Sequence, residues 1–167
     1  MSTPIRILGI DPGLRHTGWG VIEQAGARLV HVAHGVIEAP TDISMAERLG
    51  HIFEAVGELA RHHGPDAAGV EETLVNANPR SALKLGQARG AAMAALAMAG
   101  VPVAEFAPRQ IKLTVVGTGT ADKDQVKFMV QRLLPRAGEM KLDAADALAC
   151  AICAAHHRPH QIKKGAA

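Results

Sequence analysis

The chain has 167 residues, of which 48% are hydrophobic and only 2% aromatic, so the composition predicts one α/β domain with an aliphatic core. The longest apolar stretch, residues 91–104, is broken by Gly100 and Pro102, which excludes a membrane span. Two cysteines and no N-terminal signal pattern exclude a disulfide framework and predict a cytoplasmic protein.

Charge is distributed unevenly along the chain. Residues 1–79 carry a net charge of −5 and residues 80–167 a net charge of +7, which together give the overall +2. A basic half of this kind suggests a polyanionic partner, although the charge pattern taken alone is better explained by ordinary solvated charge. Together with a carboxylate metal site, it favours nucleic acid.

The first half of the chain predicts four strands and one helix. Residues 5–11 are a buried strand, and 18–24 and 28–38 form a hairpin, so the first three strands are antiparallel. Ser44 and Glu47 match a capping box, which starts a helix that ends near Gly64. Residues 67–71 are a fourth strand, and its place after a helix makes it parallel to the first.

The second half predicts mostly helices. A long helix at 80–99 leads to a fifth strand at 101–106. Short helical turns at 109–115, a Gly-Thr loop at 117–120 and helices at 122–134 and 142–156 follow. We expect a single domain over residues 4–157 and a disordered basic tail over 158–167. Periodicity alone establishes an α/β fold with a mixed sheet. The finer prediction, a five-stranded sheet flanked by helices, depends on a family resemblance.

Four carboxylates stand in apolar surroundings. Asp11 and Glu71 each end a hydrophobic strand, and Asp143 and Asp146 lie three apart in an alanine-rich helix. Buried carboxylates need partners or a metal ion, and like charges at this helical spacing repel each other. A set of oxygen ligands without cysteine or histidine suits Mg²⁺ or Mn²⁺ rather than zinc.

Several motifs along the chain resemble the RuvC family of Holliday-junction resolvases. They are the blocks at residues 9–13, 17–20, 70–71, 81–90, 109–117 and 143–149. The resemblance implies a ribonuclease-H-like fold, a homodimer, magnesium-dependent cleavage of four-way DNA junctions in recombination and repair, and cooperation with the RuvA–RuvB branch-migration complex. By motif position, the four catalytic acids of the family fall on Asp11, Glu71, Asp143 and Asp146.

The same resemblance assigns the roles of the site residues. Two Mg²⁺ ions, for which Mn²⁺ substitutes, would be bridged by Asp11, with Glu71 on the ion that activates water and the helical pair on the ion near the leaving oxygen. The interpretation also includes a set of DNA-binding residues: Leu74, Arg80, Lys84, Gln87, Arg109, Lys112, Thr118 and Lys123. Leu74 stands where many family members carry an aromatic residue, so base stacking at that position is lost.

Other interpretations stay open at this stage. An actin-like nucleotide binder also begins with an Asp-x-Gly hairpin, but 167 residues leave no room for a second lobe. A related nuclease acting on RNA or on non-junction DNA would carry the same acids, and a non-cleaving junction-binding protein is a further alternative. The pair Cys150 and Cys153 lies within a helix, where buried structural cysteines are more common than metal or redox sites.

Overall fold

The computed structural model describes residues 3–73 and 78–158, and its strands form one mixed sheet in the order β3-β2-β1-β4-β5. The first three strands are antiparallel, β4 is parallel to β1, and β5 is parallel to β4. This confirms the predicted topology. The strands are β1 (Ile5–Asp11), β2 (His16–Ala25), β3 (Arg28–Glu38), β4 (Ala67–Glu71) and β5 (Val103–Phe106).

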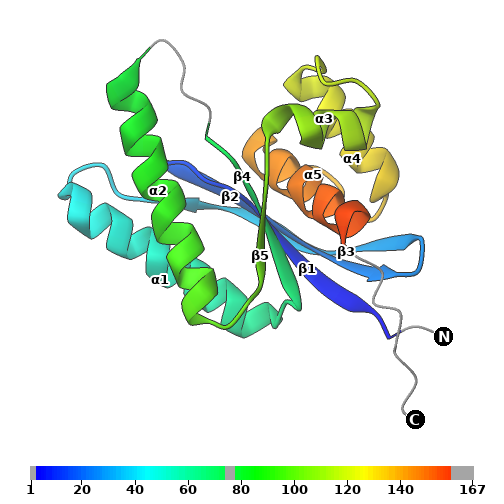
Figure 1. Cartoon of the computed structure of the whole chain (residues 1–167), viewed down its shortest axis with the longest axis horizontal. Helices are drawn as coiled ribbons and strands as arrows, with labels where there is room; N and C mark the ends of the chain where they lie inside the picture. The colour runs from blue at the N-terminus through cyan, green and yellow to red at the C-terminus, as the bar shows by residue number, and fades with distance from the viewer. Residues whose placement is uncertain (1–2, 74–77, 159–167) are drawn as a thin grey trace.

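Helices cover both faces of the sheet (Figure 1). On one face lie α1 (Met45–His63) and α2 (Pro79–Met98); on the other lie α3 (Pro108–Val116), α4 (Lys123–Leu133) and α5 (Leu142–His157). In the part of the chain that the structure describes, no helix is both long and apolar enough to cross a membrane. Leu74 and the tail from residue 159 onward lie outside the described residues.

Local signals in the sequence set the element boundaries. Ser44 and Glu47 form the predicted capping box, with the Ser44 N–H donating to the Glu47 carboxylate at 2.8 Å, and Gly64 ends α1 at a φ of 54°. The fifth strand begins at Val103, two residues later than predicted. Pro102 has no N–H to give to a ladder, although its carbonyl still accepts from the Ala68 N–H at 2.8 Å.

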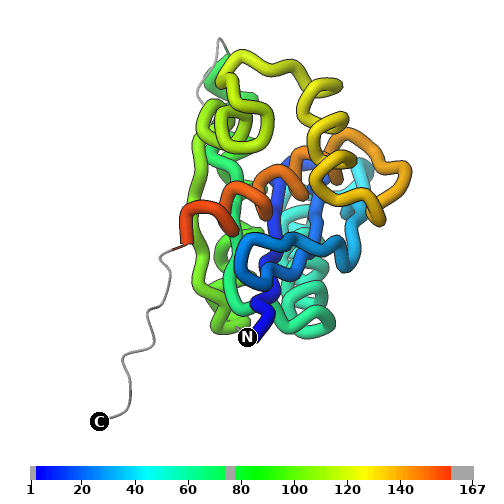
Figure 2. The backbone as a smooth tube through the Cα atoms, turned by 90° about the vertical axis from the view of Figure 1, so that its right-hand side faces the viewer, coloured from blue at the N-terminus to red at the C-terminus, as the bar shows by residue number. Residues whose placement is uncertain are grey.

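Helix α5 lies almost in contact with the sheet backbone because the facing strand positions are glycines. A Cβ added to Gly9 would overlap the Ala147 carbonyl oxygen, and one added to Gly18 would overlap that of Asp143. Figure 2 shows α5, in orange and red, crossing in front of the blue strands β1 and β2. This close approach brings the first turn of α5 to the end of β1, where Asp11 lies.

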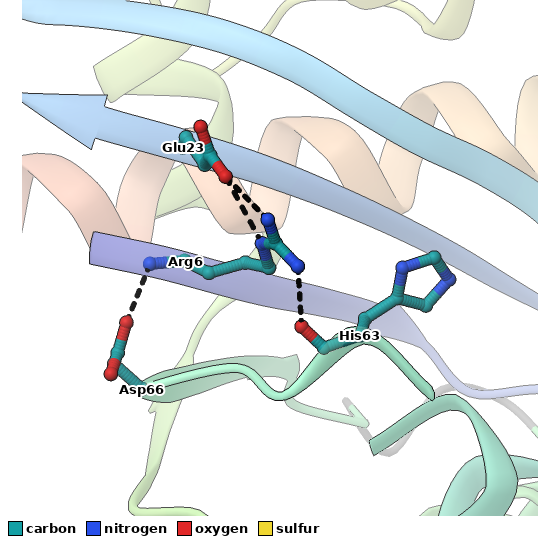
Figure 3. A network of polar contacts seen from close by, with 4 residues as sticks. All are labelled: Arg6, Glu23, His63 and Asp66. Atoms are coloured by element: carbon teal, nitrogen blue, oxygen red, sulfur yellow. Dashed lines mark hydrogen bonds and ion pairs between the residues drawn. The ribbon is translucent and has the colours of Figure 1, made fainter. Parts of the chain in front are cut away.

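Arg6 joins four segments of the chain at the opposite end of the sheet (Figure 3). Its guanidinium donates to the His63 carbonyl at 2.8 Å and to the Glu23 carboxylate at 3.2 Å, and its main-chain N–H donates to Asp66 at 2.7 Å. These bonds tie the end of α1 and the start of β4 to β1 and β2. They therefore help to fix the position of β4 against β1 on which the site depends.

Candidate active site

Two of the predicted acids are brought together by the register of two parallel strands. Ile10 pairs with Val70, so Asp11 and Glu71 stand next to each other at the carboxyl ends of β1 and β4. Side chains alternate along a strand. Because Ile10 and Val70 pack in the core beneath α1 and α2, the two acids face the other side, toward α5.

A cavity of about 150 Å³ joins these acids to the helices above them. Asp146 of α5 lines it together with Asp11 and Glu71, so three of the four predicted acids meet in one pocket. Asp143 is one helical turn earlier, does not line this cavity, and acts on Asp146 through its charge. Within residues 3–73 and 78–158, no three side chains of His, Cys, Asp or Glu converge on a point where they would all bind one ion.

Burial and mutual repulsion make these carboxyls hard to ionise. The pKa of Asp11 is raised from 3.8 to about 9, first by burial and then by the charges of Glu71 and Asp146. Burial likewise raises the pKa of Glu71 and that of Asp146. Such a site favours any cation that compensates the negative charge.

Two lysines supply positive charge to the same pocket. The Lys123 ammonium lies 3.3 Å from the Asp146 carboxylate, and this partner raises the pKa of Lys123. Lys112 of α3 also lines the pocket. The three carboxylates offer the oxygen ligands that a hard divalent cation prefers, so their chemistry fits such a cation, although their side chains do not all converge on one point. A bound cation would compensate their negative charge beyond what the two lysines supply.

An apolar wall completes the pocket, and it could not be predicted from the sequence. Pro108 and Ile111 of α3, Val126 of α4 and Ala149 of α5 line it beside the acids. In the sequence, each of these residues is an ordinary helix position. They come together as one wall only when α3, α4 and α5 pack against each other. An apolar lining lowers the local dielectric and strengthens the charge interactions within the site.

The other predicted DNA-binding residues that the structure describes do not line the pocket. Arg80, Lys84 and Gln87 are exposed on α2, the helix that precedes the edge strand β5 in the chain. On the other side of the sheet, the Arg109 side chain lies against Gly119, and the Thr118 hydroxyl is 3.0 Å from that of Thr120. The loop at 117–120 therefore adjoins α3 as an exposed edge.

The two cysteines are structural, as predicted. Cys150 and Cys153 are both free and buried in α5, and burial raises the pKa of both thiols. Cys153 lies 3.6 Å from the Thr114 hydroxyl and the same distance from a His157 ring nitrogen, which leaves it a packed, protonated side chain.

Comparison with known proteins identifies the family. Residues 7–154 match the family model described as "Crossover junction endodeoxyribonuclease RuvC". A protein of that name from Hyphomonas neptunium is 92% identical over the full length of both chains. One from Maricaulis maris is 60% identical over 95% of each chain. The chain belongs to the RuvC family.

Solved RuvC structures share the fold. The structure of T. thermophilus RuvC in complex with a Holliday junction substrate is 35% identical, covers 90% of this chain and 93% of its own, and superposes with a TM-score of 0.83. A yeast mitochondrial Holliday junction resolvase, at 15% identity and a TM-score of 0.61, is similar in fold alone. The RuvC match includes the ends of β1 and β4 and the first turn of α5, and hence all four acids. The ribonuclease-H-like architecture predicted for the chain is thereby confirmed.

Proposed function

We propose that this protein resolves Holliday junctions in homologous recombination and DNA repair, as a magnesium-dependent endodeoxyribonuclease that makes paired, symmetric nicks. One observation carries the proposal. In a chain of the RuvC family, Asp11, Glu71 and Asp146 from three separate elements line one pocket, with Lys112 and Lys123 beside them. A purely structural role would not require three carboxylates to share a buried site.

The acids would hold two Mg²⁺ ions, with Asp11 common to both and Asp143 joining Asp146 on α5. When bound, such ions activate water and stabilise the charge that develops at phosphorus. Mn²⁺ has similar ligand preferences and would substitute. The raised pKa values support this assignment, because a divalent cation would relieve the repulsion that now keeps protons on the site.

The other residues of the pocket would position the scissile phosphate. Lys112 and Lys123 line the cavity from two helices, so both ammonium groups can face a phosphate that enters beside the acids. Charge placed in advance at that point stabilises the transition state at no cost of reorganisation. The wall formed by Ile111 and Val126 limits the water that competes for these groups.

A broader surface would bind the arms of the junction. Arg80, Lys84 and Gln87 on α2 and Arg109 and Thr118 on the opposite side are exposed and belong to the basic half of the chain. Basic side chains that contact phosphates provide affinity and orientation without reading sequence. Leu74, which lies outside the described residues, would add an aliphatic wedge at the opened junction.

A homodimer would act on the junction, because two-fold symmetry supplies two identical active sites to a substrate with matching symmetry. Ligatable ends, with a 5′-phosphate and a 3′-hydroxyl, are the expected products. By its family, the protein would work in the cytoplasm with the RuvA–RuvB branch-migration complex. Its match to RuvC structures, one with a Holliday junction bound, supports this assignment.

A cleavage assay on three substrates tests the proposal. With Mg²⁺, we expect paired nicks in a synthetic four-way junction and little cleavage of linear duplex or of an RNA–DNA hybrid. Preferential cleavage of the hybrid or of linear duplex would favour the related nuclease. Junction binding without cleavage in any divalent ion would favour the non-cleaving protein.

A pair of variants connects the activity to the pocket. Asp146→Asn should abolish nicking while the affinity for the junction stays within about twofold of the wild type. The matched control is Glu54→Gln on α1, an exposed acid on the far side of the sheet, which should change neither property. Loss of both binding and cleavage in Asp146→Asn would show that the acid is structural.

A further inference from the structure

Arg89 contacts the catalytic strand from the side of the sheet that faces away from the pocket. Its Nε donates to the main-chain carbonyl of Glu71 at 3.2 Å, and its Nη2 forms an ion pair with Glu105 of β5. The Arg89 side chain is only 20% exposed. One guanidinium therefore joins α2 to the ends of two neighbouring strands.

The register of the sheet shows that Arg89 lies outside the pocket. Val70 pairs with Glu105, and paired residues of parallel strands point to the same face, which here is the face covered by α1 and α2. The Glu71 carboxylate points to the opposite face, into the pocket. Arg89 thus holds the backbone of Glu71 from behind while the side chain of Glu71 lies in the site.

The Arg89 bond adds to the main-chain support at the end of β4, where the Glu72 N–H donates to the Phe106 carbonyl at 2.9 Å. Glu71 is the last residue of β4, and its carbonyl is a strong acceptor that needs a donor once it is partly buried. Helix α2 packs chiefly against α1 and makes much less contact with β4 and β5. A charged hydrogen bond from Arg89, held in direction by Glu105, is stronger than a neutral one and fixes the angle at which the strand ends.

We propose that Arg89, oriented by Glu105, is a positioning residue that sets the Glu71 carboxylate for binding of a divalent cation. This inference rests on the proposed function, in which Glu71 is a metal ligand. Residues behind a metal ligand fix its orientation, and their loss typically weakens metal binding or activity by about 10- to 100-fold. The same bond also connects the catalytic strand to α2, the helix that carries Arg80, Lys84 and Gln87.

Direct measurement of cation binding tests the inference. Arg89→Met keeps the apolar stem of the side chain and removes the guanidinium. We expect it to weaken Mn²⁺ binding, measured by electron paramagnetic resonance, about tenfold and to lower kcat for junction cleavage by a similar factor. The Kd for the junction without divalent ions and the KM should stay within about twofold of the wild type, because the Arg89 guanidinium is held by the Glu71 carbonyl and Glu105 and not directed toward the exposed face of α2.

Two further variants separate positioning from folding. Arg89→Lys keeps the charge but lacks the planar fork that reaches two acceptors, so Mn²⁺ affinity should recover only in part. Glu105→Gln, at a side chain that is 43% exposed, should weaken Mn²⁺ binding about threefold. If Arg89→Met fails to fold, Arg89→Lys and Glu105→Gln test the inference in its place. Wild-type Mn²⁺ affinity in both of them would overturn it. The control Arg61→Met, on the exposed surface of α1, should bind Mn²⁺ as the wild type does.

A variant of the ligand itself separates failure of the inference from failure of the proposed function. If Glu71→Gln binds Mn²⁺ and cleaves normally, the proposed function is wrong at Glu71. If Glu71→Gln loses both properties while Arg89→Met keeps both, only the positioning role of Arg89 is overturned. A lower Tm for Arg89→Met with unchanged Mn²⁺ affinity would likewise show that the contact is merely structural.

Discussion

Asp11 shows at the scale of one residue how function and stability oppose each other. It is held against Glu71 and Asp146 in a buried pocket, which raises its pKa to about 9. Folding must therefore either keep a proton on this group or place a charge where it repels two others. Sites that bind cations through buried acids carry this cost when no cation is present.

Replacing Asp11 should stabilise the protein and inactivate it. We expect Asp11→Asn to raise the unfolding free energy in the absence of divalent ions at pH 8 by about 2 kcal/mol, or roughly 5 °C in Tm, because it removes the need for a proton or a buried charge. Nicking of the junction should be lost. Thermal melts in EDTA and a cleavage assay measure the two effects. A lower Tm in Asp11→Asn would contradict the unfavourable role of the charge, and Glu54→Gln serves as the exposed control.

The pH dependence follows from the same pKa. In the folded protein without divalent ions, Asp11 keeps its proton up to about pH 9, whereas in the unfolded chain it loses it near its ordinary value of 3.8. Between these values the folded state binds more protons, so the contribution of Asp11 lowers stability as pH rises. This loss begins above pH 3.8 and levels off above about pH 9.

A cation must displace protons from the site, so its apparent affinity should increase with pH. We expect the Mg²⁺ concentration at half-maximal cleavage to fall by at least tenfold between pH 6.5 and pH 8.5, with proton release on binding. Cleavage titrations at several pH values, and calorimetry in buffers of different ionisation enthalpy, measure these effects. A Mg²⁺ requirement that does not change with pH would show that the acids are already ionised in the free protein.

Some features of individual residues could be predicted from the sequence and others could not. Asp11 and Glu71 were identifiable because each ends an apolar run, and the spacing of Asp143 and Asp146 placed them on one helical face. The ion pair of Lys123 with Asp146 and the contact of Arg89 with the Glu71 carbonyl could not be predicted. Both are contacts between elements that meet only in the folded structure.

At the scale of elements, the glycines beneath α5 determine where the site forms. Gly9 and Gly18 leave room for the backbone of α5, and Gly18 pairs with Asp11 across β1 and β2. The sequence predicted both the strands and the helix correctly, because their periodicity and caps are local. It did not show that the glycines were needed for contact with the helix, since a glycine in a strand can equally mark a bulge or a turn.

A methyl group at Gly18 should displace α5, the helix that carries Asp143 and Asp146. Its Cβ would overlap the Asp143 carbonyl, so the first turn of α5 must move away from β1. We expect Gly18→Ala to destabilise the protein by about 1–3 kcal/mol. Cleavage by the folded fraction should fall about 100-fold, because a shift of about 1 Å is enough to misalign reacting groups.

The matched control for this change is Gly50→Ala on α1. An added Cβ there meets nothing within 4 Å, so the substitution should leave cleavage unchanged and slightly increase helix stability. Circular dichroism melts and single-turnover cleavage rates measure both variants. A normal cleavage rate in Gly18→Ala would mean that the position of α5 does not control the acids.

At the scale of the whole molecule, the acidic and basic halves of the sequence form different parts of the fold. The acidic first half forms β1 to β4 and α1, and the basic second half forms the helices that border the pocket. Lys112 and Lys123 enter the pocket itself, whereas Arg80 and Lys84 stand on the exposed surface of α2. The family resemblance already predicted Lys112 and Lys123 beside the scissile phosphate, and the structure places both at the pocket with the acids. The charge pattern alone predicted a basic surface but not where on the fold it lies.

This division predicts different salt responses. Without divalent ions, the logarithm of the junction affinity should fall linearly with the logarithm of the salt concentration, with a slope of about −0.9 for each phosphate neutralised. Replacing Arg80 and Lys84 together by alanine should lower the magnitude of this slope by about 2 and weaken binding, while kcat at saturating junction stays near the wild-type value.

The control is Arg61→Ala. It should not change the slope, because Arg61 lies in the last turn of α1, at the opposite end of the sheet from Glu71. Fluorescence anisotropy at 50–300 mM salt, on the order of the range over which such contacts are screened, measures the slopes. A double variant with the wild-type slope would place the DNA arms elsewhere, and a loss of kcat at saturation would show that α2 acts on the chemistry and not only on binding.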